Sequence, residues 1–178
     1  MEHNLPLKKI LISEKAINKR VKELALQISR DYEGRTPVFV GILRGAVLFY
    51  AELIKNIVID CNIDFMCLCS YEGTQCAGKP RTILDLREDI ANRHVVLVED
   101  IVDTGATALQ LLEMLKIRKP ASVEFCTLLD KPSNRKVEIV PKYAGFAIEN
   151  EFVIGYGLDY NGLYRNLPFI GVLDENKQ

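Results

Sequence analysis

The chain has 178 residues and a formal net charge of −1, from 23 basic and 24 acidic side chains, so no positive excess favours nucleic acid as a partner. Hydrophobic residues make up 48% and charged residues 26%, as in an ordinary globular protein. No segment approaches the apolar length of a membrane span, and charges interrupt the N-terminal stretch where a secretory signal would be unbroken. We therefore predict one domain over residues 1–178 that binds neither nucleic acid nor membrane.

The cysteines favour a cytoplasmic location. They are five in number and include no Cys-x-x-Cys pair, which points to reduced thiols. Cys67 and Cys69 share one face of an apolar run, so we expect them to pack in the core. A zinc site would need further ligands, and His3 and His94 do not supply them convincingly.

The first half of the chain alternates helical and extended patterns. Ser13 precedes apolar residues at helical spacing, which predicts a capped amphipathic helix. The following apolar runs are short and rich in β-branched residues, which predicts buried strands. The predicted elements are, in order, a helix from Glu14 to about Tyr32–Gly34, a strand over Pro37–Leu43, a helix from about 46 to 55, one long or two broken strands over Ile57–Tyr71, and a mobile loop over Glu72–Arg81.

The second half continues the alternation. It predicts a strand over His94–Asp100, a helix over Ala106–Arg118, a strand over Ser122–Asp130 and short strands in the tail, such as Phe146–Glu149 and Phe152–Leu158. Apolar strands that alternate with helices indicate a parallel sheet covered on both faces. Ligands collect at the carboxyl ends of such strands. Arg44-Gly45, Glu99–Thr107 and Asp130-Lys131 all follow strands, so we expect them to surround one cleft.

The run Val95–Thr107 (VVLVEDIVDTGAT) concentrates the unusual chemistry. Glu99 and Asp100 directly follow a hydrophobic strand, where their side chains would face opposite ways unless the chain turns. Two carboxylates at a strand end can accept hydrogen bonds from a vicinal diol, or bind magnesium through that diol. The alternative is that they are strand-end charges facing water.

The next residues, Asp103–Thr107, open a helix with two hydroxyls, a glycine and free backbone N–H groups. Such a turn suits a phosphate, because the helix dipole adds positive potential there. A plain helix cap made by Asp103 or Thr104 is the compatible alternative. Neither a Walker A loop nor a GxGxxG fingerprint occurs. Asp103, a carboxylate inside a phosphate turn, is a candidate for moving a proton on the group that attacks the sugar.

LVEDIVDTGAT resembles the signature of the phosphoribosyltransferases, in which an apolar strand is followed by two acidic residues and a turn of the form D/A-T-G-x-T. GILRGA, SYEGT, LLDKP and EFVIGYGLDYNGLYRNLPFIGV, in this order, resemble the 6-oxopurine branch of that family, the hypoxanthine–guanine phosphoribosyltransferases. The resemblance spans nearly the whole chain. It implies an α/β fold with a central parallel sheet flanked by helices, and a small hood subdomain from the N- and C-terminal segments.

The resemblance also implies an activity. Hypoxanthine, and by extension guanine, would react with phosphoribosyl pyrophosphate and magnesium to give the nucleotide and pyrophosphate, in a cytoplasmic homodimer or homotetramer. A phosphoribosyltransferase that prefers xanthine is one alternative. Another is a non-catalytic regulator that binds nucleotide and nucleic acid through the same fold, although the near-neutral charge and the presence of Asp103 and Lys131 count against it.

Individual roles are likewise implied by the resemblance. Glu99 and Asp100 would bind the ribose and magnesium, and Asp159 would bind a second magnesium. The 5′-phosphate would be bound by Thr104, Gly105, Ala106 and Thr107 with the backbone of Asp103. Pyrophosphate would be contacted by Arg165 and the Arg44-Gly45 backbone. At the purine, Asp103 would be the proton partner of N7 and Lys131 would donate to O6. Phe152 would stack on the base, and the Val153 backbone would contact its edge. A lid containing Ser70 and Tyr71 would cover the site.

The residues themselves support these roles unevenly. Without the resemblance, Lys131 could be a solvated turn residue, and Phe152 is better interpreted as a core aromatic. Asp159 and Arg165 would then be surface charges or an ion pair. Two positions depart from the family pattern. Arg44 stands where many members have lysine, and Ala106 where a longer residue is frequent. If both residues act through the backbone, we expect these two departures to have little effect on the binding of pyrophosphate and of the 5′-phosphate.

Overall fold

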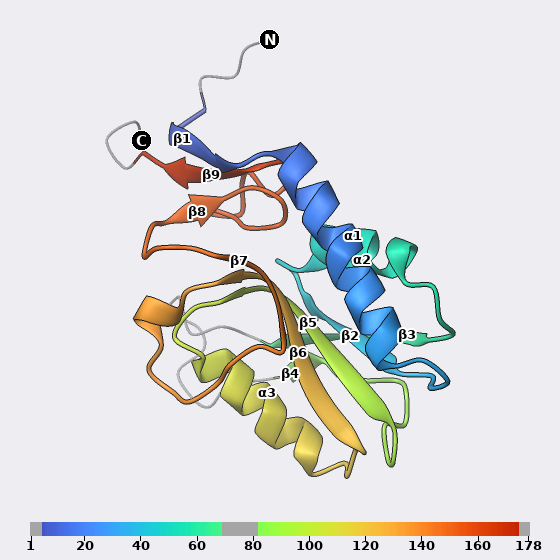
Figure 1. Cartoon of the computed structure of the whole chain (residues 1–178). Helices are drawn as coiled ribbons and strands as arrows, with labels where there is room; N and C mark the ends of the chain where they lie inside the picture. Colours follow the sequence, from blue (N-terminus) through green and yellow to red (C-terminus); the bar gives the residue numbers. More distant parts are fainter. Residues whose placement is uncertain (1–4, 69–81, 175–178) are drawn as a thin grey trace.

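The computed structural model describes residues 5–68 and 82–174, which form two sheets and the helices that cover them (Figure 1). Within these residues, no helix is long and apolar enough to cross a membrane. The elements are, in order, β1 (Leu7–Ile12), α1 (Glu14–Asp31), β2 (Val38–Leu43), α2 (Val47–Asn56), β3 (Asn62–Leu68), β4 (Thr82–Leu84), β5 (His94–Val102), α3 (Ala106–Lys116), β6 (Ser122–Asp130), the 3-10 turn η1 (Pro132–Asn134), β7 (Tyr143–Ala147), β8 (Val153–Ile154) and β9 (Ile170–Leu173).

The main sheet confirms the predicted parallel arrangement. Its strand order is β4-β3-β2-β5-β6-β7, and every neighbouring pair is parallel except β3 with β4. The chain runs outward from β2 to β3, then returns to β5 on the other side of β2 and continues to β6 and β7. The order therefore reverses between β2 and β5, and the crevice at such a reversal is where open α/β sheets bind ligands.

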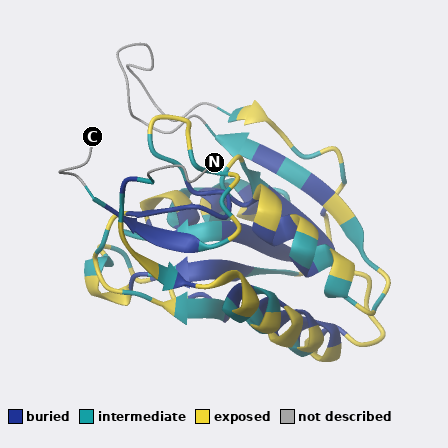
Figure 2. Cartoon of the chain, turned by 90° about the horizontal axis from the view of Figure 1, so that it is seen from above, coloured by how far each residue is buried: buried dark blue, intermediate teal, exposed yellow. Residues whose placement is uncertain are grey.

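Helices cover both faces of this sheet, as predicted. Phe39, Val96 and Val98 belong to the cluster that α1 and α2 bury, whereas Val40 and Leu97 belong to the cluster buried by α3. Alternate residues of a strand thus enter opposite cores, as the period of two requires. In Figure 2 the helices show exposed residues on their outer sides, while the strands between them are largely buried.

The helix α1 has the cap and the buried stripe that its sequence predicts. The Ser13 hydroxyl accepts a hydrogen bond from the Ala16 N–H at 3.3 Å, so the first turn is capped. The residues buried along the helix recur at its period, on the face toward the sheet: Ile17, Val21, Leu24, Ala25, Ile28 and Ser29.

A second, antiparallel sheet with the order β1-β9-β8 joins the two ends of the chain. It is the small hood that the family resemblance implies. β1 was not predicted, because Lys8 and Lys9 interrupt its apolar pattern and most of the strand is not buried. Pairing with β9, from Leu7 opposite Leu173 to Ile12 opposite Ile170, is what makes this segment a strand.

Several element boundaries differ from prediction. The tail strands β7 and β8 cover Tyr143–Ala147 and Val153–Ile154, so the predicted limits Phe146–Glu149 and Phe152–Leu158 are wrong. β3 is one strand and begins only at Asn62, where its parallel pairing with Val38 starts, so the extended interpretation of residues 57–61 is wrong. β5 continues to Val102 because β6 pairs with it that far, and α3 ends at Lys116. The described cysteines, Cys61, Cys67 and Cys126, are free thiols. Cys126 is in the core, whereas Cys67 is only partly buried, so the expectation that Cys67 packs in the core is wrong. The predicted loop Glu72–Arg81, with Ser70, Tyr71 and Cys69, lies outside the described residues.

Candidate active site at the carboxyl edge of the main sheet

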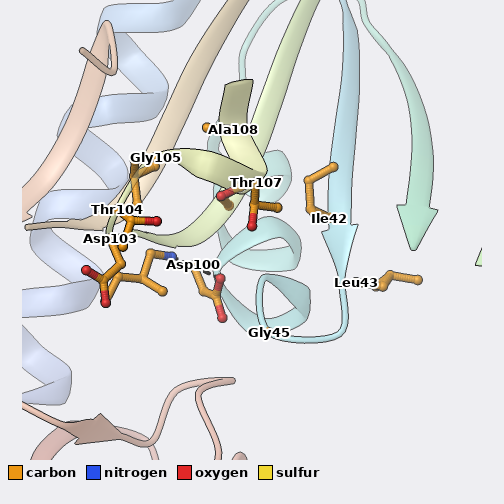
Figure 3. Close-up of a pocket in the computed structure, with 12 residues that line it drawn as sticks. Ile42, Leu43, Gly45, Asp100, Asp103, Thr104, Gly105, Thr107 and Ala108 are labelled. Carbon is orange, nitrogen blue, oxygen red and sulfur yellow. Dashed lines mark hydrogen bonds between the residues drawn. The ribbon is translucent and has the colours of Figure 1, made fainter. Parts of the chain in front are cut away.

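The site is a cleft that opens where β2 and β5 part. Their pairing ends with Gly41 opposite Val98, whereas β5 stays paired with β6 as far as Val102 opposite Asp130. The resulting cleft has a volume of about 350 Å³ (Figure 3). Its lining comes from the end of β2, the end of β5 and the turn into α3: Ile42, Leu43, Gly45, Glu99, Asp100, Ile101, Val102, Asp103, Thr104, Gly105, Thr107 and Ala108.

Glu99 and Asp100 both line this cleft, although they point to opposite sides of the strand. β5 does not turn at these residues, so Asp100 continues the row of Val96 and Val98 toward α2. A Cβ added to Gly45, at the start of α2, would lie only 1.6 Å from Asp100 Oδ2. Glu99 is only 5% exposed, and its Oε1 has no hydrogen-bond partner. The interpretation of Glu99 as a charge facing water is therefore wrong.

Burial disfavours the ionised form of both carboxyl groups. It raises the pKa of Glu99 to about 8, and the neighbouring charge of Asp100 contributes to the same shift. Burial also raises the pKa of Asp100 to about 6, against the opposing effect of the hydrogen bond that the Ile101 N–H donates to Asp100 Oδ1 at 2.9 Å. Ligands that offset this negative charge, hydroxyl donors or a cation, would therefore find a site with unsatisfied acceptors.

The raised pKa of Glu99 predicts a pH-dependent stability for protein free of divalent cations. Between the ordinary pKa of 4.5 and the folded value of about 8, the folded state holds more protons than the unfolded state, so the free energy of unfolding falls as pH rises. Melting temperatures measured from pH 6 to pH 9 should fall by several degrees, because each kcal/mol lost from the free energy of unfolding lowers the melting temperature by about 2–4 °C. Glu99→Gln should flatten this slope. An equally steep slope in Glu99→Gln would show that Glu99 is not the titrating group.

The turn between β5 and α3 is a cradle of backbone groups. Gly105 caps α3 with a φ of +84°, so the predicted cap by the side chain of Asp103 or Thr104 is wrong. The Thr104 hydroxyl instead accepts a local hydrogen bond from the Ala106 N–H at 3.3 Å. The first N–H groups of a helix lack helical acceptors, and Thr104, Gly105 and Thr107 line the cleft at this helix start. The turn is therefore suited to an anion.

Asp103 is held by two residues of the turn that follows β6. Lys131 Nζ lies 3.5 Å from Asp103 Oδ2, and the Asn134 side-chain amide donates a hydrogen bond to Asp103 Oδ1. Lys131 is only 6% exposed, so its interpretation as a solvated turn residue is wrong. Asn134 belongs to no motif that the sequence offers. Its contact exists because the ends of β5 and β6 are neighbours in the sheet.

The hood reaches the cleft through the turn after β8. Gly157 lies against Gly45, since a Cβ at Gly157 would be 1.9 Å from the Gly45 carbonyl oxygen. Arg165 pairs with Asp159 at 2.6 Å and donates to the Gly157 carbonyl at 2.6 Å, which confirms the ion pair that the sequence left as an alternative. The charges of Arg165 and Asp159 also act on Asp100, so this pair lies near the acidic end of the cleft. The Leu43–Arg44 peptide is cis, and the Arg44 side chain is exposed.

Gly45 predicts a measurable cost for adding a single methyl group. Gly45→Ala should lower the free energy of unfolding by about 1–3 kcal/mol, because the new Cβ overlaps the Asp100 carboxylate and one of the two must move. Thermal unfolding measures this change, and Gly34→Ala is the control, since a Cβ at Gly34 meets nothing within 4 Å. Gly34 has a φ of +71°, so that control carries only backbone strain. Equal melting temperatures for the two variants would contradict the close approach.

The other predicted residues of the described part lie outside the lining of the cleft. Phe152 is 50% exposed and meets Tyr160 edge to face at 5.8 Å, so its interpretation as a core aromatic is wrong. Val153 is buried in β8 opposite Val172. Within the described residues, the predicted positions outside the lining are Arg44, Ala106, Lys131, Phe152, Val153, Asp159 and Arg165. Ser70 and Tyr71 lie outside the described part.

Nothing in the described ranges, 5–68 and 82–174, forms a group of three or more His, Cys, Asp or Glu side chains that could hold a metal ion unaided. Glu99 and Asp100 nevertheless offer oxygen donors of the kind magnesium prefers, and Glu99 Oε1 is buried without a partner. A magnesium ion here would complete its coordination with oxygens of a bound substrate and water.

Comparisons with known proteins identify the family of this chain. A family model described as the phosphoribosyl transferase domain matches residues 9–161. The hypoxanthine-guanine phosphoribosyltransferase of Streptococcus pneumoniae strain R6 is 50% identical over 170 residues, which cover 95% of this chain and 94% of the relative. A solved hypoxanthine phosphoribosyltransferase from Staphylococcus aureus aligns with a TM-score of 0.89 at 48% identity, covering 94% of this chain and 92% of that one. A hypoxanthine-guanine phosphoribosyltransferase from Bacillus anthracis aligns with a TM-score of 0.88 at 45% identity, covering 94% and 99%. The chain therefore belongs to the phosphoribosyltransferase family, in the branch of the hypoxanthine-guanine phosphoribosyltransferases.

Proposed function

We propose that this protein transfers the phosphoribosyl group of phosphoribosyl pyrophosphate to hypoxanthine and guanine, with magnesium, in purine salvage. The observation that carries the proposal is the cleft itself, in which an acidic pair, with Glu99 buried, and a helix-capping turn face one space. A ribose 5-phosphate needs both features, since its diol requires acceptors and its phosphate requires donors. The names of the relatives supply the purine.

At the ribose, Glu99 and Asp100 accept hydrogen bonds from the two hydroxyls. The unpartnered Glu99 Oε1 supports this assignment, because a buried acceptor gains most from a donor that replaces water. The same two residues would hold the magnesium–diol unit, and Asp159 would serve a second ion. Bound magnesium would offset negative charge on the pyrophosphate. Because the pKa of Glu99 is raised to about 8, its proton competes with these ligands at neutral pH.

At the 5′-phosphate, the turn from Asp103 to Thr107 supplies donors. The N–H groups of Gly105, Ala106 and Thr107 and the hydroxyls of Thr104 and Thr107 bind the phosphate oxygens, with the positive end of α3 behind them. Ala106 acts through its N–H alone. The glycine at position 105 is required, because its Cβ would meet Val137 Cγ2 at 2.7 Å.

At the purine, Lys131 donates to O6 and Asp103 accepts the proton that leaves N7. The separation of 3.5 Å between Lys131 Nζ and Asp103 Oδ2 supports this pairing, since the acceptor O6 and the donor N7–H are adjacent on one edge of the base. The exposed ring of Phe152 is free to stack on the base, and the Val153 backbone meets its edge.

In the reaction, N9 of the purine attacks C1 of the ribose, the bond from C1 to the pyrophosphate oxygen breaks, and pyrophosphate leaves with the bonding electrons. Arg165 and the Arg44-Gly45 backbone bind the leaving group, and the Arg165–Asp159 pair holds the guanidinium beside this end of the cleft. Water must be excluded, because it would hydrolyse the sugar. The assignment of a lid to the segment with Ser70 and Tyr71 stays a prediction.

A pyrophosphate-release assay with phosphoribosyl pyrophosphate and magnesium tests the proposal. Hypoxanthine and guanine should each give release that depends on magnesium, and xanthine and uracil should react far more slowly. Faster release with xanthine would identify a xanthine-preferring enzyme. No release with any purine, together with a shift of an RNA or DNA probe, would identify a non-catalytic regulator. Gel filtration would test the further expectation of a homodimer or homotetramer, and the free thiols of the described cysteines support a cytoplasmic location.

A further inference from the structure

The turns that follow β5 and β6 are joined side by side. β5 and β6 remain in register to Val102 opposite Asp130, the last residue of each strand. The Lys131 N–H donates to the Val102 carbonyl at 3.0 Å, and the Lys136 N–H donates to the Thr104 carbonyl at 2.9 Å. The segment from 131 to 136 therefore lies along the phosphate turn, with backbone contacts at both of its ends.

Asn134 is the residue of this segment that reaches the Asp103 carboxylate most directly. Its side-chain amide donates to Oδ1, whereas Lys131 Nζ stands 3.5 Å from Oδ2. The Asp103 side chain is 41% exposed, so without donors it would exchange between rotamers in water. The amide comes from a well-held position, because the Asn134 N–H bonds to the Lys131 carbonyl at 3.2 Å and the next residue, Arg135, pairs with Asp130.

We propose that Asn134 is a positioning residue for Asp103. Its amide fixes Oδ1 and thereby presents Oδ2 to N7 of the purine, an inference that rests on the proposed role of Asp103. Lys131 cannot do this throughout turnover, because the same ammonium is assigned to O6 of the base. A side-chain amide is also chemically suitable for this role, because it donates a hydrogen bond to the carboxylate but cannot transfer a proton to it.

Two variants of Asn134 separate the donor from the side-chain volume. Asn134→Ala should lower kcat about tenfold, the effect of losing one hydrogen bond to a charged group, while KM for phosphoribosyl pyrophosphate stays within about twofold. Asn134→Asp keeps the shape but replaces the donor with a second carboxylate, so kcat should fall at least as far. Ser133→Ala is the matched control, because Ser133 is exposed in the same 3-10 turn. Wild-type kcat in Asn134→Asp would overturn the proposal.

A double-mutant cycle with Asp103→Asn distinguishes positioning from a general structural role. If Asn134 acts through Asp103, then Asn134→Ala should have no further effect on kcat in the Asp103→Asn background. The same tenfold loss in both backgrounds would overturn the proposal, as would a slow Asp103→Asn beside a wild-type Asn134→Ala. If Asp103→Asn itself turns over at the wild-type rate, the failure lies in the proposed role of Asp103, and the inference about Asn134 falls with it.

Discussion

Asp103→Asn is expected to lower kcat by about 10²–10⁴-fold, the usual contribution of a positioned general base, and to leave KM for phosphoribosyl pyrophosphate within a few-fold. The substitution keeps the size of the side chain and an oxygen that can accept from the Asn134 amide or face Lys131. It removes the negative charge that faces Lys131 and the capacity to take a proton. Because the backbone of the phosphate turn is unchanged, the 5′-phosphate should bind as before.

Steady-state kinetics with hypoxanthine and with guanine measure this effect. Asp60→Asn is the control for the chemical change, since Asp60 is exposed in the loop before β3, away from the residues that line the cleft. Melting temperatures of both variants show whether the fold is kept. Wild-type turnover in Asp103→Asn would remove Asp103 from proton transfer, and a large rise in KM with unchanged kcat would assign it to binding instead.

Lys131→Met is expected to raise KM for hypoxanthine and guanine by about 10–100-fold, because O6 loses a charge-assisted donor inside the site. The same change should relax selection against adenine. The 6-amino group of adenine cannot accept a hydrogen bond, so the wild-type ammonium would be left without an acceptor when adenine binds. Methionine has a similar length to lysine, which limits the effect of the lost volume at a side chain only 8% exposed in the native protein.

Initial rates with hypoxanthine, guanine and adenine measure both parts of this prediction. Lys136→Met is the control, because Lys136 is exposed in the same segment and contacts the phosphate turn through its backbone N–H. An unchanged ratio of hypoxanthine to adenine rates would exclude Lys131 from the purine site. A lower kcat with unchanged purine KM would instead indicate that Lys131 acts mainly on Asp103.

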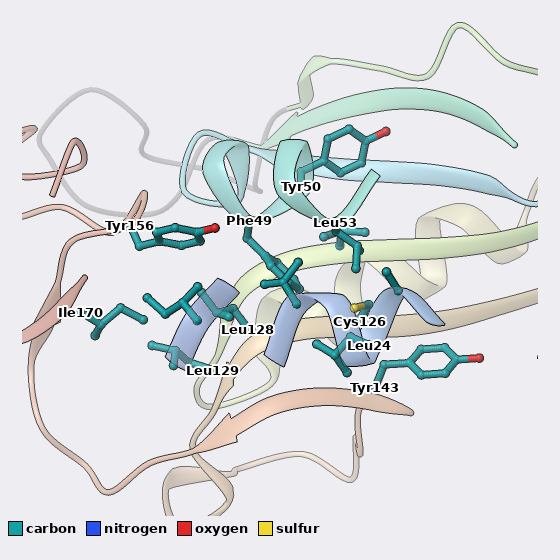
Figure 4. Packing of buried hydrophobic residues seen from close by; sticks show 14 of the residues in the cluster. Leu24, Phe49, Tyr50, Leu53, Cys126, Leu128, Leu129, Tyr143, Tyr156 and Ile170 are labelled. Atoms are coloured by element: carbon teal, nitrogen blue, oxygen red, sulfur yellow. The ribbon is translucent and has the colours of Figure 1, made fainter. Parts of the chain in front are cut away.

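The strands β2, β5 and β6 and the helices that cover them were predictable from sequence because local periodicity decides them. The strand over Ser122–Asp130 has the predicted limits, and α1 buries the face that its apolar spacing predicts. Figure 4 shows how these patterns meet, with Leu24 of α1, Phe49 and Leu53 of α2 and Cys126 of β6 in one cluster. Each residue enters this core because its own segment turns it inward, with a period of 3.6 in the helices and 2 in the strands.

The position of the site was predictable for a related reason. A parallel sheet gathers the carboxyl ends of its strands at one edge, so residues 99–107, 130–131 and 44–45 had to approach one another. What the sequence left open was the environment of each side chain. Glu99 could have been solvated and Lys131 exposed, and nothing local to either residue decides between these states.

Only the tertiary structure decided those environments, because they depend on pairings between distant segments. The pairing of β2 with β5 ends at Gly41 opposite Val98, and the cleft opens beyond this pair. Glu99 is buried there, and its Oε1 has no hydrogen-bond partner. β1 becomes a strand through β9 at the other end of the chain. Asn134 meets Asp103 because β5 and β6 end together. By itself the sequence determined the three helices and the strands β2, β5 and β6, and which strand ends carry chemistry, since these follow from local spacing. Register and burial follow from long-range contacts, so the three-dimensional fold set the charge state and the partners of the residues at the site.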